Sequence, residues 1–167
     1  MLQQDRAPIY GRFVLRDLPQ VAGLMAGGQL LLPYTSSILL AETAEEILSD
    51  KIRALLERKY LKGRDLFDIW WIVSHMQIKI QWPILREKLA MYDARFAPAR
   101  RGDYFQTSEA AAEMIRALDS DLTRFIPQKI VFEYRKDDFR AFIRAVQSIT
   151  SELWDQGLRE YYESGGR

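Results

Sequence analysis

The chain has 167 residues, 48% of them apolar, which is enough to bury the core of one ordinary domain and excludes a disordered tail. Its 24 basic and 23 acidic residues leave a formal net charge of +1. Any contact with nucleic acid or an anionic membrane must therefore be a local patch. The absence of Cys excludes disulfides and thiolate chemistry, and the single His75 excludes His-rich zinc sites. Carboxylates, Lys, Arg and hydroxyl groups remain, with a hard cation such as Mg²⁺ if a metal is needed.

The sequence shows no targeting or membrane signal. The first seven residues, MLQQDRA, contain no basic segment followed by an apolar stretch, as a signal peptide would. The apolar runs fall far short of the roughly 18 residues that span a bilayer. We therefore expect a cytoplasmic protein that makes no membrane contact.

Short apolar or alternating runs separated by Pro and Gly occupy the first forty residues, and they predict strands and turns. The predicted strands are Tyr10–Leu15, Gln29–Leu32 and Ser37–Leu40. Two or three strands need a partner layer. We expect residues 1–42 to be the strand-rich part of a larger unit, completed either by the helices that follow or by strands before Met1.

From Thr43 the pattern becomes helical, and Thr43 with Glu46 forms a capping box that starts the first helix. Lys62-Gly63 separates the first two helices, and Pro127 ends the fourth. The predicted helices cover residues 43–60, 64–76, 82–92, 108–125 and 137–156, with a loop over 96–102 and a frayed tail. The sequence thus predicts an α+β fold that is predominantly α: a few N-terminal strands followed by a helical bundle.

Two cations project from the apolar side of the first predicted helix. At 100° per residue, Lys51 and Arg58 fall at about 40° and 20°, inside the apolar arc, and the other charges cluster on the far side. A buried cation is costly unless an anion meets it. Each could instead lay its stem on apolar surface and keep its charge in water.

The second predicted helix carries the matching acids. Asp65 lies inside its apolar arc, and Asp68 lies at the edge of the arc on the same side. Because the connection is short, we expect residues 43–78 to form a helical hairpin that brings Lys51 and Arg58 near Asp65, with a C-terminal helical region over 79–167. Asp65 could instead simply favour the dipole of its own helix.

Residues 36–76 resemble the AbiEii/AbiGii family of nucleotidyltransferase toxins from type IV toxin–antitoxin and abortive-infection systems of phage defence. The similarity rests on the family's third motif, Lys-x-x-Ala-Leu-x-x-Arg, and its fourth, Arg-Asp-x-x-Asp-Leu. They correspond here to Lys51–Arg58 and Arg64–Asp68, with Ile69 in place of the final Leu.

The resemblance implies transfer of a nucleotide from an NTP to an acceptor, tRNA in characterised relatives, with Mg²⁺ and a cognate antitoxin as partner. It implies that Lys51 and Asp65 are catalytic, that Lys51 and Arg58 bind the nucleotide, and that Arg64 and Asp68 support them. Asp65 would orient Lys51 or act on the acceptor hydroxyl. Positioning and charge neutralisation are what such a transfer needs.

Two other features of the family do not stand ahead of Thr43: a Gly-Gly-Ser/Thr turn and the Asp-x-Asp pair that binds the metal. Gly27–Gly28 is followed by Gln29 and predicts a plain turn, and Asp5 and Asp17 are too far apart to form the pair. We expect the carboxy-terminal portion of such an enzyme without its metal ligands, whether a fragment, a misplaced start or an inactive descendant. The alternative function is a non-catalytic helical interaction module that binds an antitoxin or a partner subunit.

Two further basic segments are candidate RNA contacts, with a solvated face as the alternative. His75 ends its helix and is predicted to favour the helix dipole. The four Trp residues are predicted to be core or interface side chains. The two basic segments are a basic-aromatic loop with Arg95, Arg100 and Arg101 beside Tyr104 and Phe105, and the pair Arg140 and Arg144.

Overall fold

The computed structural model describes residues 9–14, 38–91 and 95–165. The chain divides into two compact units, residues 7–43 and the helices from Ala44 onward. Helices dominate the described residues, and one antiparallel pair of strands precedes them, which confirms the predicted α+β, predominantly α fold. The strand predicted over Gln29–Leu32 and the turn predicted at Gly27–Gly28 lie outside the described residues.

The two strands of the first unit are β1 (Tyr10–Val14) and β2 (Ile38–Glu42), close to the predicted positions. They pair antiparallel, with Tyr10 opposite Glu42 and Val14 opposite Ile38. The backbone N–H of Thr43 donates to the carbonyl of Ile9 at 2.9 Å and extends the pairing by one bond. This hairpin is the strand-rich part of the chain that the structure describes.

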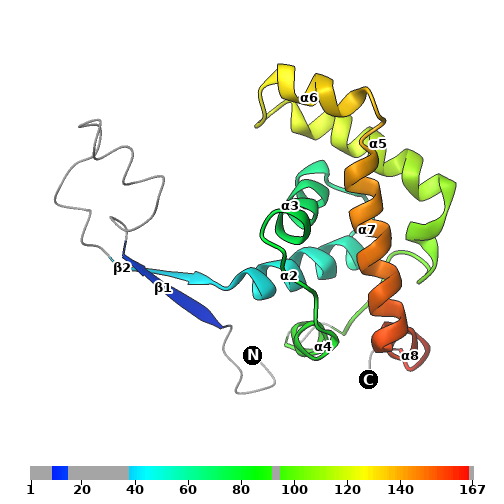
Figure 1. Cartoon of the computed structure of the whole chain (residues 1–167). Helices are drawn as coiled ribbons and strands as arrows, with labels where there is room; N and C mark the ends of the chain where they lie inside the picture. The colour runs from blue at the N-terminus through cyan, green and yellow to red at the C-terminus, as the bar shows by residue number, and fades with distance from the viewer. Residues whose placement is uncertain (1–8, 15–37, 92–94, 166–167) are drawn as a thin grey trace. The chain divides into compact units, whose positions relative to one another are not determined.

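The second unit is built from helices of 5 to 15 residues (Figure 1). Each of the five predicted helices is confirmed, with ends that shift by up to three residues. The α-helices are α2 (Ala44–Glu57), α3 (Gly63–Ser74), α4 (Trp82–Ala90), α5 (Ser108–Leu122), α6 (Gln128–Arg135), α7 (Arg140–Leu153) and α8 (Arg159–Glu163). A 3₁₀ turn, η3 (Tyr104–Gln106), precedes α5, and a π-helical turn, η4 (Trp154–Leu158), joins α7 to α8.

The observed helices differ from the predicted ones in two places. Helix α7 begins at Arg140 and not at Asp137, because Asp138 and Phe139 have φ of 54° and 55°, in the left-handed region. Helix α6 is not among the predicted helices; it follows Pro127, and Val131 is its buried residue.

Helix α3 lies at the centre of this unit and packs against α2, α5 and α7 (Figure 1). Its first residue, Gly63, allows a close approach to α5, because a Cβ there would lie 2.3 Å from the carbonyl oxygen of Ala117. The Gly63 N–H donates to Asp121 Oδ2 at 2.8 Å. The start of α3 is therefore fixed against α5, and this positions the acidic side chains in the first turns of α3.

The charged side of α2 that faces away from this core is covered by α4. The side chain of Lys88 from α4 is 1% exposed, and its Nζ lies 3.0 Å from Glu46 Oε2 and 3.0 Å from Asp50 Oδ2. Arg53 donates to the backbone carbonyl of Lys88 at 3.3 Å. The charged side chains that helical periodicity places on the far side of α2 thus bind α4, and some of them are buried.

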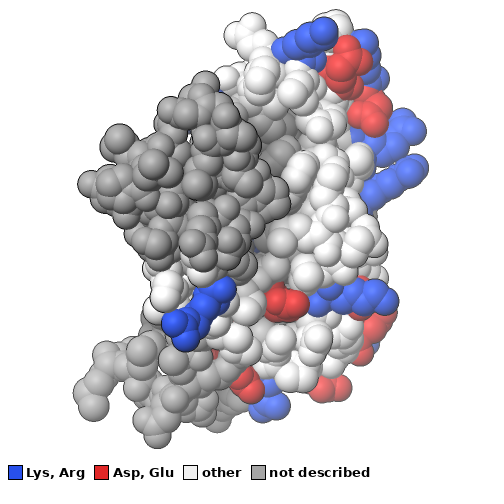
Figure 2. All heavy atoms as spheres, turned by 60° about the vertical axis from the view of Figure 1, so that its left-hand side comes forward, with Lys and Arg blue, Asp and Glu red and all other residues white. Residues whose placement is uncertain are grey.

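The surface carries charges of both signs. Figure 2 shows Lys and Arg side chains beside Asp and Glu side chains, with uncharged surface between the groups. This distribution agrees with the formal net charge of +1. Within the described part of the chain, no helix is both long and apolar enough to cross a bilayer.

Candidate functional site

Four charged side chains meet where α2 and α3 lie against each other. Lys51 Nζ lies 2.9 Å from Asp65 Oδ1 and 2.7 Å from Asp68 Oδ2. Arg58 Nη1 donates to Asp65 Oδ2. We call Lys51, Arg58, Asp65 and Asp68 the charged cluster. The predicted approach of Lys51 and Arg58 to Asp65 is confirmed.

The cluster forms because each helix presents its charges on an apolar side. Lys51 is on α2 beside its buried Leu residues, and Arg58, two turns later, directly follows the last residue of α2. Asp65 is next to the buried Leu66 in the first turn of α3. The side chain of Asp65 is 10% exposed and that of Lys51 is 24% exposed. A carboxylate as buried as Asp65 needs partners, and both of its oxygens have one.

The carboxylates keep Lys51 protonated. Partial burial alone would lower its pKa, but the hydrogen bonds to Asp68 and Asp65 outweigh burial and raise the pKa of Lys51 above its ordinary value. An ammonium group has three N–H donors. Two of those of Lys51 point at Asp65 and Asp68, which leaves one for a further oxygen ligand.

Arg64, the remaining residue of the two motifs, does not join the charged cluster. Its side chain is exposed, and among the residues that the structure describes it forms no ion pair. Arg64 instead lines a surface hollow of about 430 Å³ together with side chains from the α2–α3 connection and the end of α5.

Mg²⁺, which the resemblance implies, needs free anionic oxygens as ligands. Both oxygens of Asp65 accept from Lys51 or Arg58, and Asp68 Oδ2 faces Lys51. A metal ion there would also lie beside two cationic groups. The charged cluster therefore does not fit Mg²⁺, and the described residues contain no other group of three or more acidic or His side chains that would hold it.

Arg100 holds the end of α2 directly behind Arg58, a role the sequence did not predict. The Arg100 guanidinium donates to the backbone carbonyls of Arg58 and Lys59, the latter at 3.1 Å. It also donates to Glu113 Oε1 at 2.9 Å, and Tyr104 donates its hydroxyl proton to the other Glu113 oxygen. Arg100 thus fixes the backbone that carries Arg58.

The other candidate RNA contacts differ in whether their Arg side chains bind groups within the protein. Arg95 donates to the carbonyl of Gly165 at 2.7 Å, and Arg101 donates both to Asp103 Oδ1 at 3.0 Å and to Asp103 Oδ2 at 2.8 Å. Arg140 and Arg144 are exposed on α7. The cations of the 96–102 loop and its flanks therefore make bonds within the protein.

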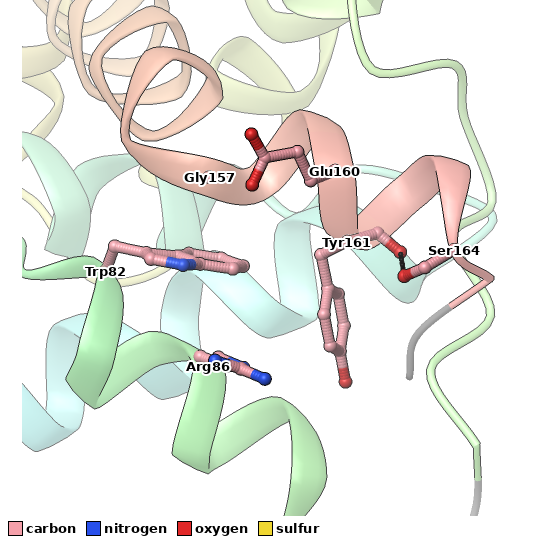
Figure 3. A pocket seen from close by; sticks show the side chains of 6 residues that line it. All are labelled: Trp82, Arg86, Gly157, Glu160, Tyr161 and Ser164. Atoms are coloured by element: carbon pink, nitrogen blue, oxygen red, sulfur yellow. Dashed lines mark hydrogen bonds between the residues drawn. The ribbon is translucent and has the colours of Figure 1, made fainter.

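A second cavity, of about 240 Å³, lies between α4 and the C-terminal turns (Figure 3). The Trp82 ring lies against the backbone of Gly157, whose φ is +139° and where a Cβ would come within 2.5 Å of Trp82 Nε1. Arg86 and Tyr161 lie on the other side of this ring (Figure 3). None of the residues that line this second cavity belongs to the two motifs, so we do not place the predicted chemistry there.

Comparison with known proteins shows the family. The family described as nucleotidyl transferase AbiEii toxin, type IV toxin–antitoxin system, matches residues 17–162, which is most of the chain. No curated protein and no solved structure gives a match. The matched range includes the whole charged cluster. The chain therefore belongs to the AbiEii family of nucleotidyl transferase toxins of type IV toxin–antitoxin systems.

Proposed function

We propose that this protein transfers a nucleotide from an NTP to an RNA acceptor such as tRNA, that Lys51 and Arg58 hold the NTP phosphates, and that the ligands of the implied Mg²⁺ lie outside the charged cluster. The observation that carries the proposal is the position of Lys51, a half-buried ammonium fixed by Asp65 and Asp68 with one N–H left to donate. Membership of a nucleotidyl transferase family supports the same activity.

In this reaction the acceptor hydroxyl oxygen forms a bond to the α-phosphorus of the NTP. The bond from that phosphorus to the pyrophosphate oxygen breaks, pyrophosphate leaves, and the hydroxyl proton is released to solvent. Charge builds up on phosphate oxygens, where cations fixed in advance stabilise the transition state. Lys51 and Arg58 supply such cations.

The contacts of Asp65 favour an orienting role over action on the acceptor hydroxyl. Lys51 and Arg58 both bind its oxygens, which disfavours protonation of the carboxylate. We therefore assign Asp65, with Asp68, to positioning Lys51. Arg64 supports the site from the neighbouring hollow, through its charge and not by direct contact.

Type IV toxin–antitoxin membership implies an antitoxin partner. We propose that a cognate antitoxin binds this protein and limits its activity. Because NTPs and acceptor RNA are cytoplasmic, we place the protein in the cytoplasm.

The proposal is tested by transfer of radioactive label from each α-³²P NTP to total cellular RNA. The wild-type protein and Lys136→Ala, which removes a cation on α6, should label RNA equally. Lys51→Ala and Asp65→Asn should reduce labelling by about 100-fold or more, as expected for a lost electrostatic contact in the transition state. No labelling by the wild-type protein, or full labelling by Lys51→Ala, would contradict the proposal.

One observation favours a second candidate, a non-catalytic interaction module for the antitoxin or a partner subunit. The charged cluster contains two cations and two carboxylates that bind one another, as a structural ion-pair network would. Under this alternative the cluster stabilises the α2–α3 hairpin, and its loss lowers stability without any change in nucleotide binding.

A further inference from the structure

Three cations line a hollow at the α2–α3 connection. We call it the basic hollow, and its volume is about 430 Å³, within the range of small-ligand pockets. In the described part of the chain, none of its three cations forms an ion pair. The lining residues are Tyr60, Leu61, Lys62, Arg64, Asp121, Arg124 and Phe125.

The charge of the basic hollow suits an anion. Among the described residues that line it there is one acid, Asp121, which accepts a hydrogen bond from the Gly63 N–H at 2.8 Å. Against this single negative charge stand Lys62, Arg64 and Arg124. The hollow therefore carries a local positive charge on a protein whose total charge is close to neutral.

A row of ring side chains starts beside this hollow. Phe67 and Trp71 on α3 and His75, which caps its C-terminal end, follow one another at four-residue intervals, and we call them the aromatic row. The rings of Phe67 and Trp71 are 15° from parallel at 6.2 Å, and those of Trp71 and His75 are 8° from parallel at 4.1 Å. Phe125, which lines the hollow, packs edge-on against Phe67 at 6.1 Å.

The row is partly open to solvent, because Trp71 is 45% exposed and His75 is exposed. Phe125 and Tyr60, which line the hollow, are 46% and 62% exposed, and the Lys62 ammonium lies 5.8 Å from the centre of the Tyr60 ring. Within the row Trp71 already stacks on His75, so a flat ligand would stack on the exposed rings that line the hollow, Tyr60 and Phe125, while the cations beside them bind its charge.

We propose that the basic hollow and the aromatic row bind a single-stranded segment of RNA, with phosphates in the hollow and bases on the exposed rings. Cations combined with stacking rings are the recurrent means of binding single strands. A duplex is a poorer fit, since its bases are already stacked. The choice of RNA over DNA rests on the proposed function. The inference that the ligand is a single strand does not, because it depends only on the cations and the exposed rings.

The site adjoins the charged cluster along the chain. Lys62 and Arg64 lie between Arg58 and Asp65 in the sequence. The basic hollow and the charged cluster therefore share the segment that links α2 to α3. An RNA strand in the hollow would therefore reach the hairpin that carries Lys51. This would bring an acceptor strand to the proposed nucleotide site.

The test is fluorescence anisotropy of a fluorescein-labelled, unstructured 12-nucleotide RNA, titrated with the full chain over a range of salt concentrations. Tyr60→Ala should weaken binding by at least about fivefold, the lower end for one stacked base, and Tyr60→Phe should restore most of it. Lys62→Ala and Arg124→Ala should each weaken binding and reduce the salt slope by about 0.7. Arg159→Ala, which removes an exposed cation on α8, should bind as the wild type does.

Absence of wild-type binding overturns the proposal. So does a Tyr60→Ala or Lys62→Ala protein that melts as the wild type does and binds RNA equally well. Binding of a DNA 12-mer or duplex RNA in preference to single-stranded RNA also overturns it. Failure here is distinguishable from failure of the proposed function. Label transfer that needs Lys51 but not Tyr60 would overturn only this surface, and RNA binding that needs Tyr60 with transfer that ignores Lys51 would overturn only the nucleotide site.

Discussion

Lys51 and Asp65 are fourteen residues apart and on different helices, and their side chains meet at 2.9 Å. The contact depends on the short connection between α2 and α3. Side chains from other parts of the chain bind both ends of this connection. Arg100 binds the backbone carbonyls at the end of α2, and Asp121 binds the first N–H of α3. The geometry of the Lys51–Asp65 pair is thus set by side chains from the later helical region.

The charged cluster should respond unequally to loss of its two central members. Lys51→Ala should lower the free energy of unfolding by less than about 1 kcal/mol, because Asp65 keeps Arg58 as a partner. Asp65→Ala should lower it by about 3 kcal/mol, because Arg58 and Lys51 then face each other without the central acid. Urea unfolding measures both values. Equal losses would instead favour a purely structural network around Lys51.

The buried ion pairs of Lys88 should be among the most sensitive contacts of the helical unit. Lys88→Ala leaves Glu46, which is fully buried, without its ammonium partner, and should lower the free energy of unfolding by about 3 to 5 kcal/mol. Lys136→Ala, which removes the exposed partner of Glu133, is the matched control and should cost less than about 1 kcal/mol. If the two variants had similar melting curves, Lys88 would not hold α4 on α2.

Gly63 should not tolerate even a methyl group. In Gly63→Ala the new Cβ would meet the Ala117 carbonyl at 2.3 Å, so α3 must move away from α5. We expect a loss of about 1 to 3 kcal/mol in the free energy of unfolding, although Ala is the better helix former. Ser120→Ala on the exposed side of α5 is the control and should change little. A Gly63→Ala protein more stable than the wild type would contradict the close approach.

The pairing of Arg100 with Glu113 predicts how stability depends on pH. Burial alone would raise the pKa of Glu113, but hydrogen bonds from Tyr104 and Arg100 outweigh burial and lower it below the ordinary value of 4.5. The stability that Glu113 contributes is thus fully present above about pH 4.5. It is lost as pH falls through the lower, folded-state pKa, because the unfolded chain takes up the proton first.

Glu113→Gln removes this titration. The difference in the free energy of unfolding between the wild type and this variant should therefore shrink as pH falls from 6 to 3, as followed by urea unfolding at each pH. A difference that stays constant over this range would show that the Glu113 carboxylate gains nothing from Arg100 and Tyr104.

The α2–α3 hairpin and its charges could be predicted because they depend on local periodicity. The apolar arcs of α2 and α3 determine which sides of the two helices face each other. Because the connection has few residues, the two helices must pack as neighbours. Lys51, Arg58 and Asp65 follow from these two conditions alone. Arg64, by contrast, points into the basic hollow, which includes side chains from α5.

The contacts that the sequence did not predict join segments far apart along the chain. Lys88 reaches Asp50 across 38 residues and Arg100 reaches Arg58 across 42. Periodicity places Asp50 on the polar side of α2, but it does not say that α4 covers that side.

The central claim is that Lys51, held by Asp65 and Asp68, binds NTP phosphate, and isothermal titration with each NTP tests it most directly. We predict that the wild type binds and that Lys136→Ala binds with wild-type affinity. A Lys51→Ala protein that melts normally should bind at least about tenfold more weakly, because it loses a charge-assisted hydrogen bond of about 1.5 to 3 kcal/mol. Equal affinity in Lys51→Ala and the wild type, or no binding of any NTP to the wild type, would contradict the claim.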